Sequence, residues 1–373
     1  MIIQNGNVYK EDGTFHTENL YIEDEVIAEK TKQNLVIDAT GLYVIPGLID
    51  IHLHGCMRHD LCDGLTESLQ VMSAYLLKNG ITGFCPATMT LEVERIKDIL
   101  RCAASYRNTT GAKLLGIYLE GPFLSKKYKG AQQERYLHKP DVKLFAELQK
   151  EAQGMIKILA LAPEEDTDMQ IIKALSNSVR LSVAHTAADY DLAKSAFEQG
   201  MKQVTHLYNG MEPYHHRSPG VVGAAFDTDD VMVELICDGI HVHPSVVRST
   251  FQMFGGERVL MVSDSMRATG LKDGKYVLGG QEVQVKGEKA VLTDSNVLAG
   301  SVSNLMDCMR KAVLEMKIPL ETVIKSCTMN PAKALNVYDK TGSLSVGKQA
   351  DIVILDDMLQ IQHVLKDGQL VWL

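Results

Sequence analysis

The sequence predicts an α/β protein: a (β/α)8 TIM-like barrel with a small β-sandwich domain formed by both ends of the chain. Three observations predict this fold. Strand-like segments with Asn-Gly and Asp-Gly turns stand at both ends of the 373 residues. Apolar strand-like runs alternate with helical segments through the middle of the chain. Polar side chains follow these runs, at the end of the strands where barrel enzymes keep their chemistry.

The terminal segments are short, alternate apolar with polar residues, and break at glycine. Residues 1–43 contain MIIQNGNVY, ENLYIEDEVIAEK and NLVIDATGLYV, and residues 341–373 have the same character. Two β segments that flank a long αβ middle can complete one unit by pairing with each other. We therefore expect residues 1–43 and 341–373 to form one small β-sandwich domain.

The middle of the chain, residues 44–340, is expected to be the catalytic barrel. Its eight strand-like runs are VIPGLIDIHLHG, ITGFCPATMT, KLLGIYLEGP, IKILALAPE, VRLSVAHTA, KQVTHLYNG, VMVELICDG and RVLMVSDSM. Helical patterns such as TESLQVMSAYLLKNG and YDLAKSAFEQG lie between most of them, and the second ends in glycine, as helices often do. A doubly wound open sheet is the rival fold, but it needs a GxGxxG loop after its first strand, and HLHGCMRHDLCDG does not provide one.

The segment after the eighth run differs from the alternating pattern. Residues 275–295 combine strand-like alternation with glycine turns, and they predict a β-hairpin inserted near the end of the barrel. The following segment, KAVLEMKIPLETVIKSCTMNPAKALNV, predicts the closing helices.

The composition argues against several classes of protein. A formal net charge of -9 does not suit a general nucleic-acid binder, whose footprint is a basic patch. The 7 cysteines form no CxxC pair, which argues against a disulfide framework and favours a reducing compartment. Polar residues interrupt the N-terminal apolar runs, and no run approaches the ~18 apolar residues of a membrane helix. We expect a cytoplasmic protein with neither nucleic-acid nor membrane partners.

Imidazoles and carboxylates stand at or just past the ends of successive predicted strands. In chain order they are His52, His54, Glu120, His185, His206, Asp238, His241 and Asp264. Histidines with unrelated structural roles would not be expected at the same end of successive strands. Because the C-terminal ends of barrel strands open onto one face, these side chains are expected to converge there.

Five of these residues suit a divalent metal ion. His52 and His54 stand two apart on an extended chain, so both imidazoles face the same way. Glu120 lies among apolar residues, where a carboxylate needs a cation or hydrogen bonds, and His185 and His206 would complete the ligand set. Simpler alternatives are an incidental histidine pair, a buried ion pair, or core histidines bonded to backbone. Together the five favour a metal ion, with zinc preferred and iron or another ion possible.

Two further residues have more than one interpretation. Asp264 could be a metal ligand, a general base or a helix N-cap, and we favour the base, because a divalent ion lowers the pKa of its water to about 7 and a carboxylate can then move the proton. Arg217, in the run His215-His216-Arg217, could pair with a phosphate or belong to a solvated turn, and these residues do not decide between the two. Of His241 and His243, one is expected to meet substrate, and His243 is expected to pack or cap.

The motifs together resemble those of the N-acetylglucosamine-6-phosphate deacetylases of the amidohydrolase superfamily. The resemblance spans nearly the whole chain, through PGLIDIHLHG, LEGPF, KGAQ, AHT, THLYNGM, HHRSPG, CDGIHVHP, SDSM, LAGS and GKQADIVIL. It implies metal-dependent deacetylation of N-acetyl-D-glucosamine 6-phosphate to glucosamine 6-phosphate and acetate, in amino-sugar catabolism. Strand four, ILALAPE, has no lysine at its C-terminal end, which argues against superfamily members that bridge two metals with a carboxylated lysine.

The resemblance also implies a role for each matching residue. Glu120, His185 and His206 would hold the main metal ion, and His52 and His54 a second one bridged by Glu120, so that one or two ions bind per subunit. Asp264 would be the catalytic acid and base. The substrate contacts would be Ala131, Asn209, Gly210, Arg217, His241, Leu298, Ala299 and Gly300. In the family the arginine reaches the phosphate of a neighbouring subunit's substrate, which implies a homodimer.

Three positions depart from the family pattern. Gln132 stands where many members have histidine, Arg58 replaces a small residue, and Gly210 replaces the usual alanine. They concern the sugar pocket more than the reaction, and an N-acetylgalactosamine-6-phosphate deacetylase is the nearest alternative. Two other hypotheses are an amidohydrolase acting on a different amide, and a non-enzymatic scaffold that would bind no stoichiometric metal.

Overall fold

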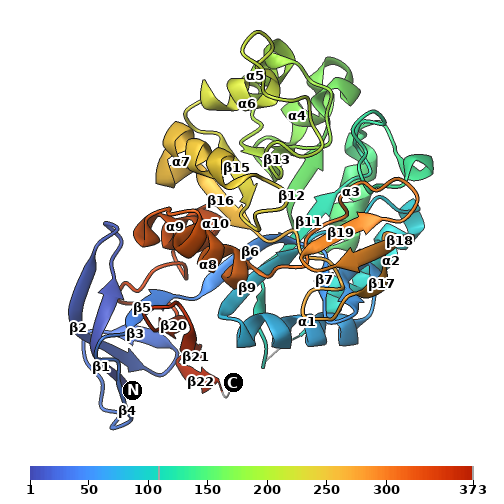
Figure 1. The fold of residues 1–373 in the computed structure, drawn as a ribbon. Coiled ribbons are helices and arrows are strands. Elements are labelled where there is room, and N and C mark those ends of the chain that lie inside the picture. The colour runs from blue at the N-terminus through green and yellow to red at the C-terminus, as the bar shows by residue number, and fades with distance from the viewer. Residues whose placement is uncertain (108–109, 372–373) are drawn as a thin grey trace.

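The computed structural model describes residues 1–107 and 110–371. Strands from both ends of the chain lie in one eight-stranded sheet, which stands to one side of the larger α/β part (Figure 1). The order in this terminal sheet is β22-β21-β20-β5-β1-β2-β3, and β4 pairs with β1. Its strands are β1 (Ile2–Tyr9), β2 (Phe15–Glu23), β3 (Val26–Ala28), β4 (Val36–Asp38), β5 (Tyr43–Pro46), β20 (Ile352–Leu355), β21 (Ile361–Lys366) and β22 (Gln369–Val371).

The larger part is a curled parallel sheet in two ladders. The first, in the order β10-β9-β6, consists of β6 (Leu48–Leu53), β9 (Ile81–Pro86) and β10 (Lys113–Leu114). The second consists of β11 (Ile117–Glu120), β12 (Ile156–Leu161), β13 (Arg180–Val183), β14 (Gln203–Val204), β15 (Met232–Ile236) and β16 (Val259–Val262), in chain order.

The two ladders approach each other at both edges. A parallel bridge joins Ala87 to Tyr118 between β9 and β11. On the other side, the Asp264 N–H donates to the His52 carbonyl at 2.9 Å, which ties the end of β16 to β6. Each of the eight predicted runs therefore contains a strand of this sheet. The first run contains strands of two different sheets, because β5 of the terminal sheet ends at Pro46 and β6 of the curled sheet begins at Leu48.

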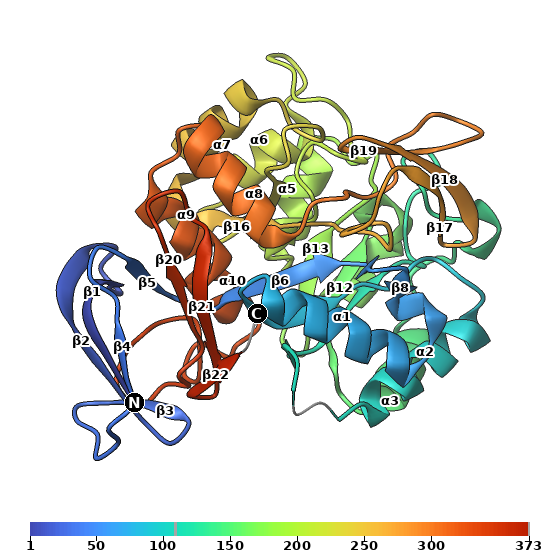
Figure 2. The same cartoon turned by 60° about the horizontal axis from the view of Figure 1, so that its bottom comes forward.

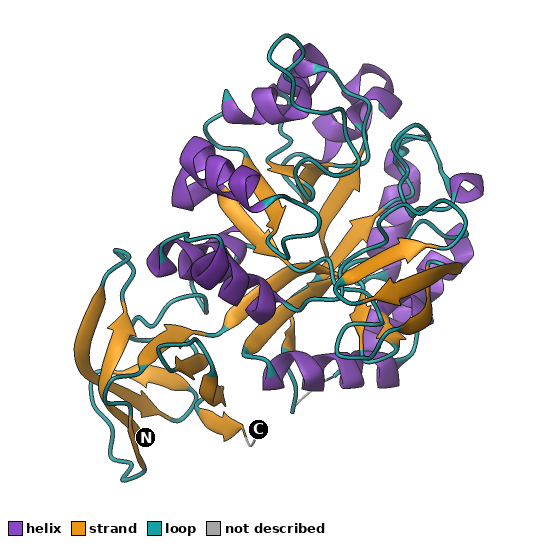
Figure 3. Ribbon diagram, viewed as in Figure 1, coloured by secondary structure: helices purple, strands orange, loops and turns teal. Residues whose placement is uncertain are grey.

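Helices surround the curled sheet (Figure 3). They are α1 (Thr66–Lys78), α2 (Val93–Ser105), α3 (Val142–Glu151), α4 (Gln170–Leu175), α5 (Tyr190–Glu198), α6 (Gly220–Phe226), α7 (Pro244–Arg258), α8 (Leu305–Arg310), α9 (Leu320–Cys327) and α10 (Met329–Ala334). Single turns are η1 (Leu61–Asp63), η2 (Glu134–Tyr136), η3 (Pro163–Glu165), η4 (Thr167–Met169) and the π-helical η5 (Lys311–Glu315). In the described part of the chain, no helix combines the length and apolarity that crossing a membrane requires.

The predicted helices are confirmed, including the glycine that ends one of them. α1 and α5 occupy the patterns at residues 66–80 and 190–200. Gly200, just past α5, has a φ of +117°, and a Cβ there would stand 2.5 Å from the Ser176 Cβ. Only glycine combines that backbone angle with so close an approach.

The insertion near the C-terminus has one strand more than a hairpin. β17 (Gly274–Leu278), β18 (Gln281–Lys286) and β19 (Lys289–Leu292) form a three-stranded antiparallel sheet. Lys286 pairs with Lys289 around a two-residue turn that contains Gly287, at φ +59°. Such turns favour glycine, and this one brings β19 back onto β18. A second small pair, β7 (Gly55–Cys56) and β8 (His59–Asp60), follows β6.

The curled sheet has an apolar layer on each face. Residues alternate between the helices outside and the interior, as successive side chains of a strand must. The interior holds an apolar cluster that includes Ile49, Ile51, Cys85, Tyr118, Ile158, Ile236, Leu260 and Val262. Buried polar side chains also lie in the sheet strands, among them Asp50, Ser182, Gln203 and Glu234. Figure 2 shows the sheet from another side, with β5 leading from the terminal sheet into β6.

Candidate metal centre and active site

A cavity of about 200 Å³ opens where the strands of the curled sheet end. It is lined by His54, Met89, Glu120, Gly130, Ala131, Gln132, His185, His206, Asn209, Gly210, His241, Asp264, Leu278, Val297, Leu298 and Gly300. The strands explain the convergence. Glu120 is the last residue of β11, and His185, His206 and Asp264 each lie two residues beyond β13, β14 and β16. The predicted gathering of polar residues at one end of the sheet is confirmed.

Three of these residues have a backbone that L-residues rarely adopt. His185, His206 and Asp264 have φ angles of 43°, 30° and 47°. Such angles cost on the order of 1–3 kcal/mol each and persist where the surroundings hold them, commonly at functional sites. The Asp264 N–H is held by the His52 carbonyl, and the His206 N–H donates to the Glu234 carboxylate at 3.1 Å.

Glu120 stands at the centre of four imidazoles. Its Oε1 lies 3.1 Å from His185 Nε2 and 3.4 Å from His206 Nε2. Its Oε2 lies 3.2 Å from His54 Nε2 and 3.7 Å from His52 Nε2. Burial opposes ionisation of this carboxyl, yet the surrounding imidazoles, His185 foremost, hold its pKa well below the ordinary value. The carboxylate therefore belongs to two groups of three possible ligands, one with His185 and His206 and one with His52 and His54.

All four imidazoles turn Nε2 toward Glu120, and three of them have an acceptor at Nδ1 on the other side of the ring. His54 Nδ1 lies 3.3 Å from the Ala87 carbonyl, and His185 Nδ1 lies 2.8 Å from the Tyr128 carbonyl. His52 Nδ1 lies 2.7 Å from the Glu234 carboxylate. Carbonyl and carboxylate oxygens only accept, so each Nδ1 carries a hydrogen, and in the neutral ring Nε2 then has the lone pair. That is the arrangement of metal-binding histidines in proteins.

The donor atoms fit a divalent cation. His52 Nε2, Glu120 Oε2 and Asp264 Oδ1 are buried and have no hydrogen-bond partner among the described residues, a costly state for polar atoms. Ligands about 2.0–2.1 Å from a tetrahedral ion lie about 3.3 Å from one another. The separations among Glu120 Oε1, His185 Nε2 and His206 Nε2 are 3.1, 3.4 and 3.2 Å.

Asp264 borders the second ligand group. Its Oδ1 lies 3.3 Å from His54 Nε2 and 3.8 Å from His52 Nε2. Burial opposes its ionisation, but the nearby imidazoles, His54 foremost, lower its pKa to about 2. An ionised carboxylate at the cavity wall can accept a proton. The N-cap alternative is wrong, because the next α-helix begins at Leu305 and Asn304 caps it.

His241 is oriented by Asp238, which lies two residues beyond the end of β15. The His241 Nδ1 lies 2.7 Å from the Asp238 carboxylate, which also accepts the backbone N–H of Ile240 and His241. Because Asp238 accepts a hydrogen bond from Nδ1, Nε2 is the ring nitrogen left to interact in the cavity that His241 lines. His243 instead caps α7, where its Nδ1 accepts from the Ser245 N–H. The expectation that one of the pair would cap is confirmed.

The other expected substrate residues divide into two sets. Ala131, Asn209, Gly210, Leu298 and Gly300 line the cavity with His241. Ala299 and Arg217 do not. Ala299 is fully buried in an apolar cluster under the insertion, and Arg217 is exposed, with its Nη1 2.6 Å from His216 Nε2. The lining residues include neither lysine nor arginine.

Several wall residues were missed from the sequence. Met89, Leu278 and Val297 line the cavity, and only their places after β9 and in the insertion pointed to it. Among the departing positions, Gln132 accepts the Thr90 N–H at 2.7 Å. Gly210 has a φ of +62°, and a Cβ there would stand 2.9 Å from His185 Nδ1. In this chain the glycine lets the loop pass close to a candidate ligand.

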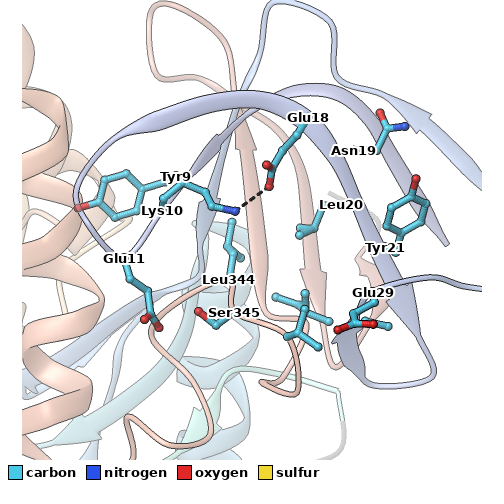
Figure 4. Close-up of a pocket in the computed structure, with 13 residues that line it drawn as sticks. Tyr9, Lys10, Glu11, Glu18, Asn19, Leu20, Tyr21, Glu29, Leu344 and Ser345 are labelled. Carbon is cyan, nitrogen blue, oxygen red and sulfur yellow. Dashed lines mark hydrogen bonds and ion pairs between the residues drawn. The ribbon is translucent and has the colours of Figure 1, made fainter.

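A larger cavity, of about 480 Å³, lies in the terminal sheet (Figure 4). It opens between β2 and residues 344–346, with an ion pair between Lys10 and Glu18 on its wall. Neither candidate metal group of the described chain contributes to it. The volume of a cavity therefore does not by itself identify the active site.

Comparisons with known proteins identify the family of the chain. The model of the Amidohydrolase family matches residues 43–371. The N-acetylglucosamine-6-phosphate deacetylase of Bacillus subtilis (strain 168) is 38% identical over 378 residues, which cover 100% of this chain and 94% of that protein. The N-acetylgalactosamine-6-phosphate deacetylase of Escherichia coli O157:H7 is 34% identical over 364 residues, 96% of each chain.

Solved structures give the same result for the fold. A mutant N-acetyl-D-glucosamine-6-phosphate deacetylase from Mycobacterium smegmatis, in complex with N-acetyl-D-glucosamine-6-phosphate, superposes with a TM-score of 0.91. It is 28% identical, and the match covers 99% of this chain and 98% of that one.

Proposed function

This chain belongs to the amidohydrolase family and, within it, to the N-acetylglucosamine-6-phosphate deacetylases, and from that premise we propose that it hydrolyses N-acetyl-D-glucosamine 6-phosphate to glucosamine 6-phosphate and acetate. It is a hydrolase of amides with the α/β fold of its family. The observation that carries the proposal is the approach of four imidazole Nε2 atoms to the buried carboxylate of Glu120.

We propose that Glu120, His185 and His206 hold the main divalent ion, and that His52 and His54 hold a second one with Glu120 as the bridge. One or two ions would then bind per subunit. Imidazole and carboxylate ligands suit zinc, and iron or another ion is an alternative. A bound divalent ion would lower the pKa of a water molecule to about 7 and polarise the amide carbonyl.

The chain's own groups then carry the proton and position the sugar. Asp264 takes a proton from the attacking water and returns it to the amine as the C–N bond breaks. His241 Nε2, oriented by Asp238, has the ring's lone pair and can accept a hydrogen bond from a substrate hydroxyl. The backbone of Ala131, Asn209 and Gly210 offers further polar contacts, and Leu298 and Gly300, in the segment after the insertion, line the sugar pocket.

The phosphate needs a cation from outside the cavity. We propose that the chain acts as a homodimer in which Arg217 of one copy reaches the substrate phosphate of the other. The argument is that Arg217 is exposed and that the cavity wall has no lysine or arginine of its own. A guanidinium can bind a phosphate through two parallel hydrogen bonds.

Arg217→Ala should therefore raise the KM for the 6-phosphate substrate by ~10–100-fold, the effect of losing a charge-assisted hydrogen bond. Turnover of the unphosphorylated N-acetyl sugar should be unchanged by the same substitution. Arg101→Ala, which removes an exposed arginine paired with Asp98 on α2, is the control and should leave both rates as they were. An unchanged KM in Arg217→Ala would rule out the phosphate role.

The experiment that tests the proposed function compares three substrates on one preparation: the gluco and galacto N-acetyl 6-phosphates and unphosphorylated N-acetylglucosamine. We expect the gluco 6-phosphate to react fastest. Faster reaction of the galacto epimer would favour the second candidate, N-acetylgalactosamine-6-phosphate deacetylase. Two observations support this candidate: the 34% identical relative, and Gln132 at a position where many family members have histidine. Equal rates with and without phosphate would overturn a phosphosugar substrate and favour another amide.

We also propose that the two parallel ladders act as one (β/α)8 barrel over residues 44–340, with residues 1–43 and 341–373 as a β-sandwich domain. The bridge from Ala87 to Tyr118 and the hydrogen bond from Asp264 to His52 support closure. A cytoplasmic location fits the seven cysteines, which are all free.

A further inference from the structure

Glu234 is a buried acidic residue to which the reaction assigns no role. It lies in β15 within the apolar run VMVELICDG, and its exposed fraction is 0%. Met232 and Ile236, two residues away on either side, face the interior of the curled sheet, so Glu234 faces it as well. A carboxylate in such a place needs strong partners.

Its partners are four donors, two for each oxygen. Oε1 accepts from the Tyr118 hydroxyl at 2.9 Å and from Gln203 Nε2 at 2.5 Å. Oε2 accepts from His52 Nδ1 at 2.7 Å and from the His206 backbone N–H at 3.1 Å. The second pair belongs to two of the proposed metal ligands, which come from different strands.

The bond to His52 determines which nitrogen faces Glu120. Because Glu234 only accepts, His52 Nδ1 carries a hydrogen, and in the neutral ring Nε2 then has the lone pair. That Nε2 is one of the buried atoms left without a partner, 3.7 Å from Glu120 Oε2. His54 and His185 are oriented by backbone carbonyls instead. Of the three groups that accept from these Nδ1 atoms, Glu234 is the one that is a side chain.

The bond to His206 holds a strained turn. His206 has a φ of 30° and Tyr208 a φ of 78°, so the chain turns sharply just after β14. The Glu234 carboxylate accepts the N–H of the first of these residues and fixes the peptide that aims the His206 ring.

Neighbouring groups hold Glu234 itself in place. Gln203 Oε1 accepts from Arg180 Nε at 2.5 Å, so its amide is held with Nε2 toward the carboxylate. The Tyr118 ring stacks on His52, with centroids 4.5 Å apart and planes 28° apart.

We propose that Glu234 is a positioning residue of the metal centre, which sets the tautomer of His52 and the backbone of His206 so that both imidazoles face Glu120. The proposal rests on the proposed ligand set, but on neither the sugar nor the reaction.

The test is Zn²⁺ binding by Glu234→Gln, with sugar absent. The amide keeps the shape but presents an N–H₂ group to donors on one side. We expect zinc affinity to fall by ~10–100-fold, the usual effect of removing a hydrogen-bond partner behind a metal ligand. In the metal-free protein, ¹⁵N spectra of the imidazoles should show His52 protonated at Nδ1 in wild type and redistributed toward Nε2–H in the variant.

Asp166→Asn is the matched control. Asp166 is also a buried carboxylate, but it accepts the N–H groups of Ile171 and Ile172 and contacts no proposed ligand. The Asp166→Asn variant should lose stability and keep zinc affinity.

Wild-type zinc affinity with an unchanged His52 tautomer in Glu234→Gln would overturn the proposal. If that variant does not fold, Tyr118→Phe decides, because it removes one donor and keeps the ring: a several-fold loss of zinc affinity is expected, and no loss overturns the proposal. A wild-type protein that binds zinc but deacetylates nothing would count against the proposed function alone.

Discussion

Asp264→Asn should retain the metal of the wild-type protein and lose turnover by ~10²-fold or more, as removal of a general acid–base group does. The carboxylate borders the ligand group of His52 and His54, and its pKa of about 2 keeps it ionised and ready to accept a proton at neutral pH. Asparagine has nearly the same shape and cannot take up that proton. The effect should fall on kcat, because the proton moves during the reaction and the sugar contacts are unchanged.

The measurement is acetate release together with metal content, determined on the same sample. Asp189→Asn serves as the control, because Asp189 caps α5 and asparagine caps equally well. The Asp189→Asn variant should match wild type in both acetate release and metal content. Wild-type turnover in Asp264→Asn would show that the proton passes through another group.

Glu120→Ala should lose the bound metal and, with it, the activity. Glu120 belongs to both candidate ligand groups, so its removal affects each proposed ion. It also leaves four imidazoles facing one another without the carboxylate that separates them, with His185 Nε2 and His206 Nε2 already 3.2 Å apart. We expect less than one ion in ten subunits after desalting, as the loss of a central ligand implies.

Elemental analysis of the desalted protein checks this prediction. Glu147→Ala, which removes an exposed carboxylate of α3 paired with Lys97, should keep the full complement. A full complement of metal in Glu120→Ala would place the ion elsewhere in the molecule.

The site could be predicted from the sequence because its signals are local. Long apolar runs show where strands end, and His52, His185 and Asp264 stand at those ends. Parallel strands then bring the side chains together, whatever the details of the loops. The positions of the ligands therefore follow from the chain order of eight runs.

Long-range partners could not be predicted in the same way. Glu234 has the same signal as Glu120, a carboxylate inside an apolar run, but its role depends on pairing with His52 from β6 and His206 after β14. No spacing in the sequence gives that register. Arg217 is a second case, because its place relative to a substrate depends on another copy of the chain. The split of the first run between two sheets depends likewise on the distant β20, which pairs with β5.

The most direct test of the central claim follows acetate release from N-acetyl-D-glucosamine 6-phosphate as metal is stripped with a chelator and then restored as Zn²⁺. If the imidazoles around Glu120 hold the ion that the reaction needs, the rate should fall in proportion to the metal removed and return with it. Acetate release that persists in metal-free protein would contradict the account, and so would a fully loaded protein that releases none.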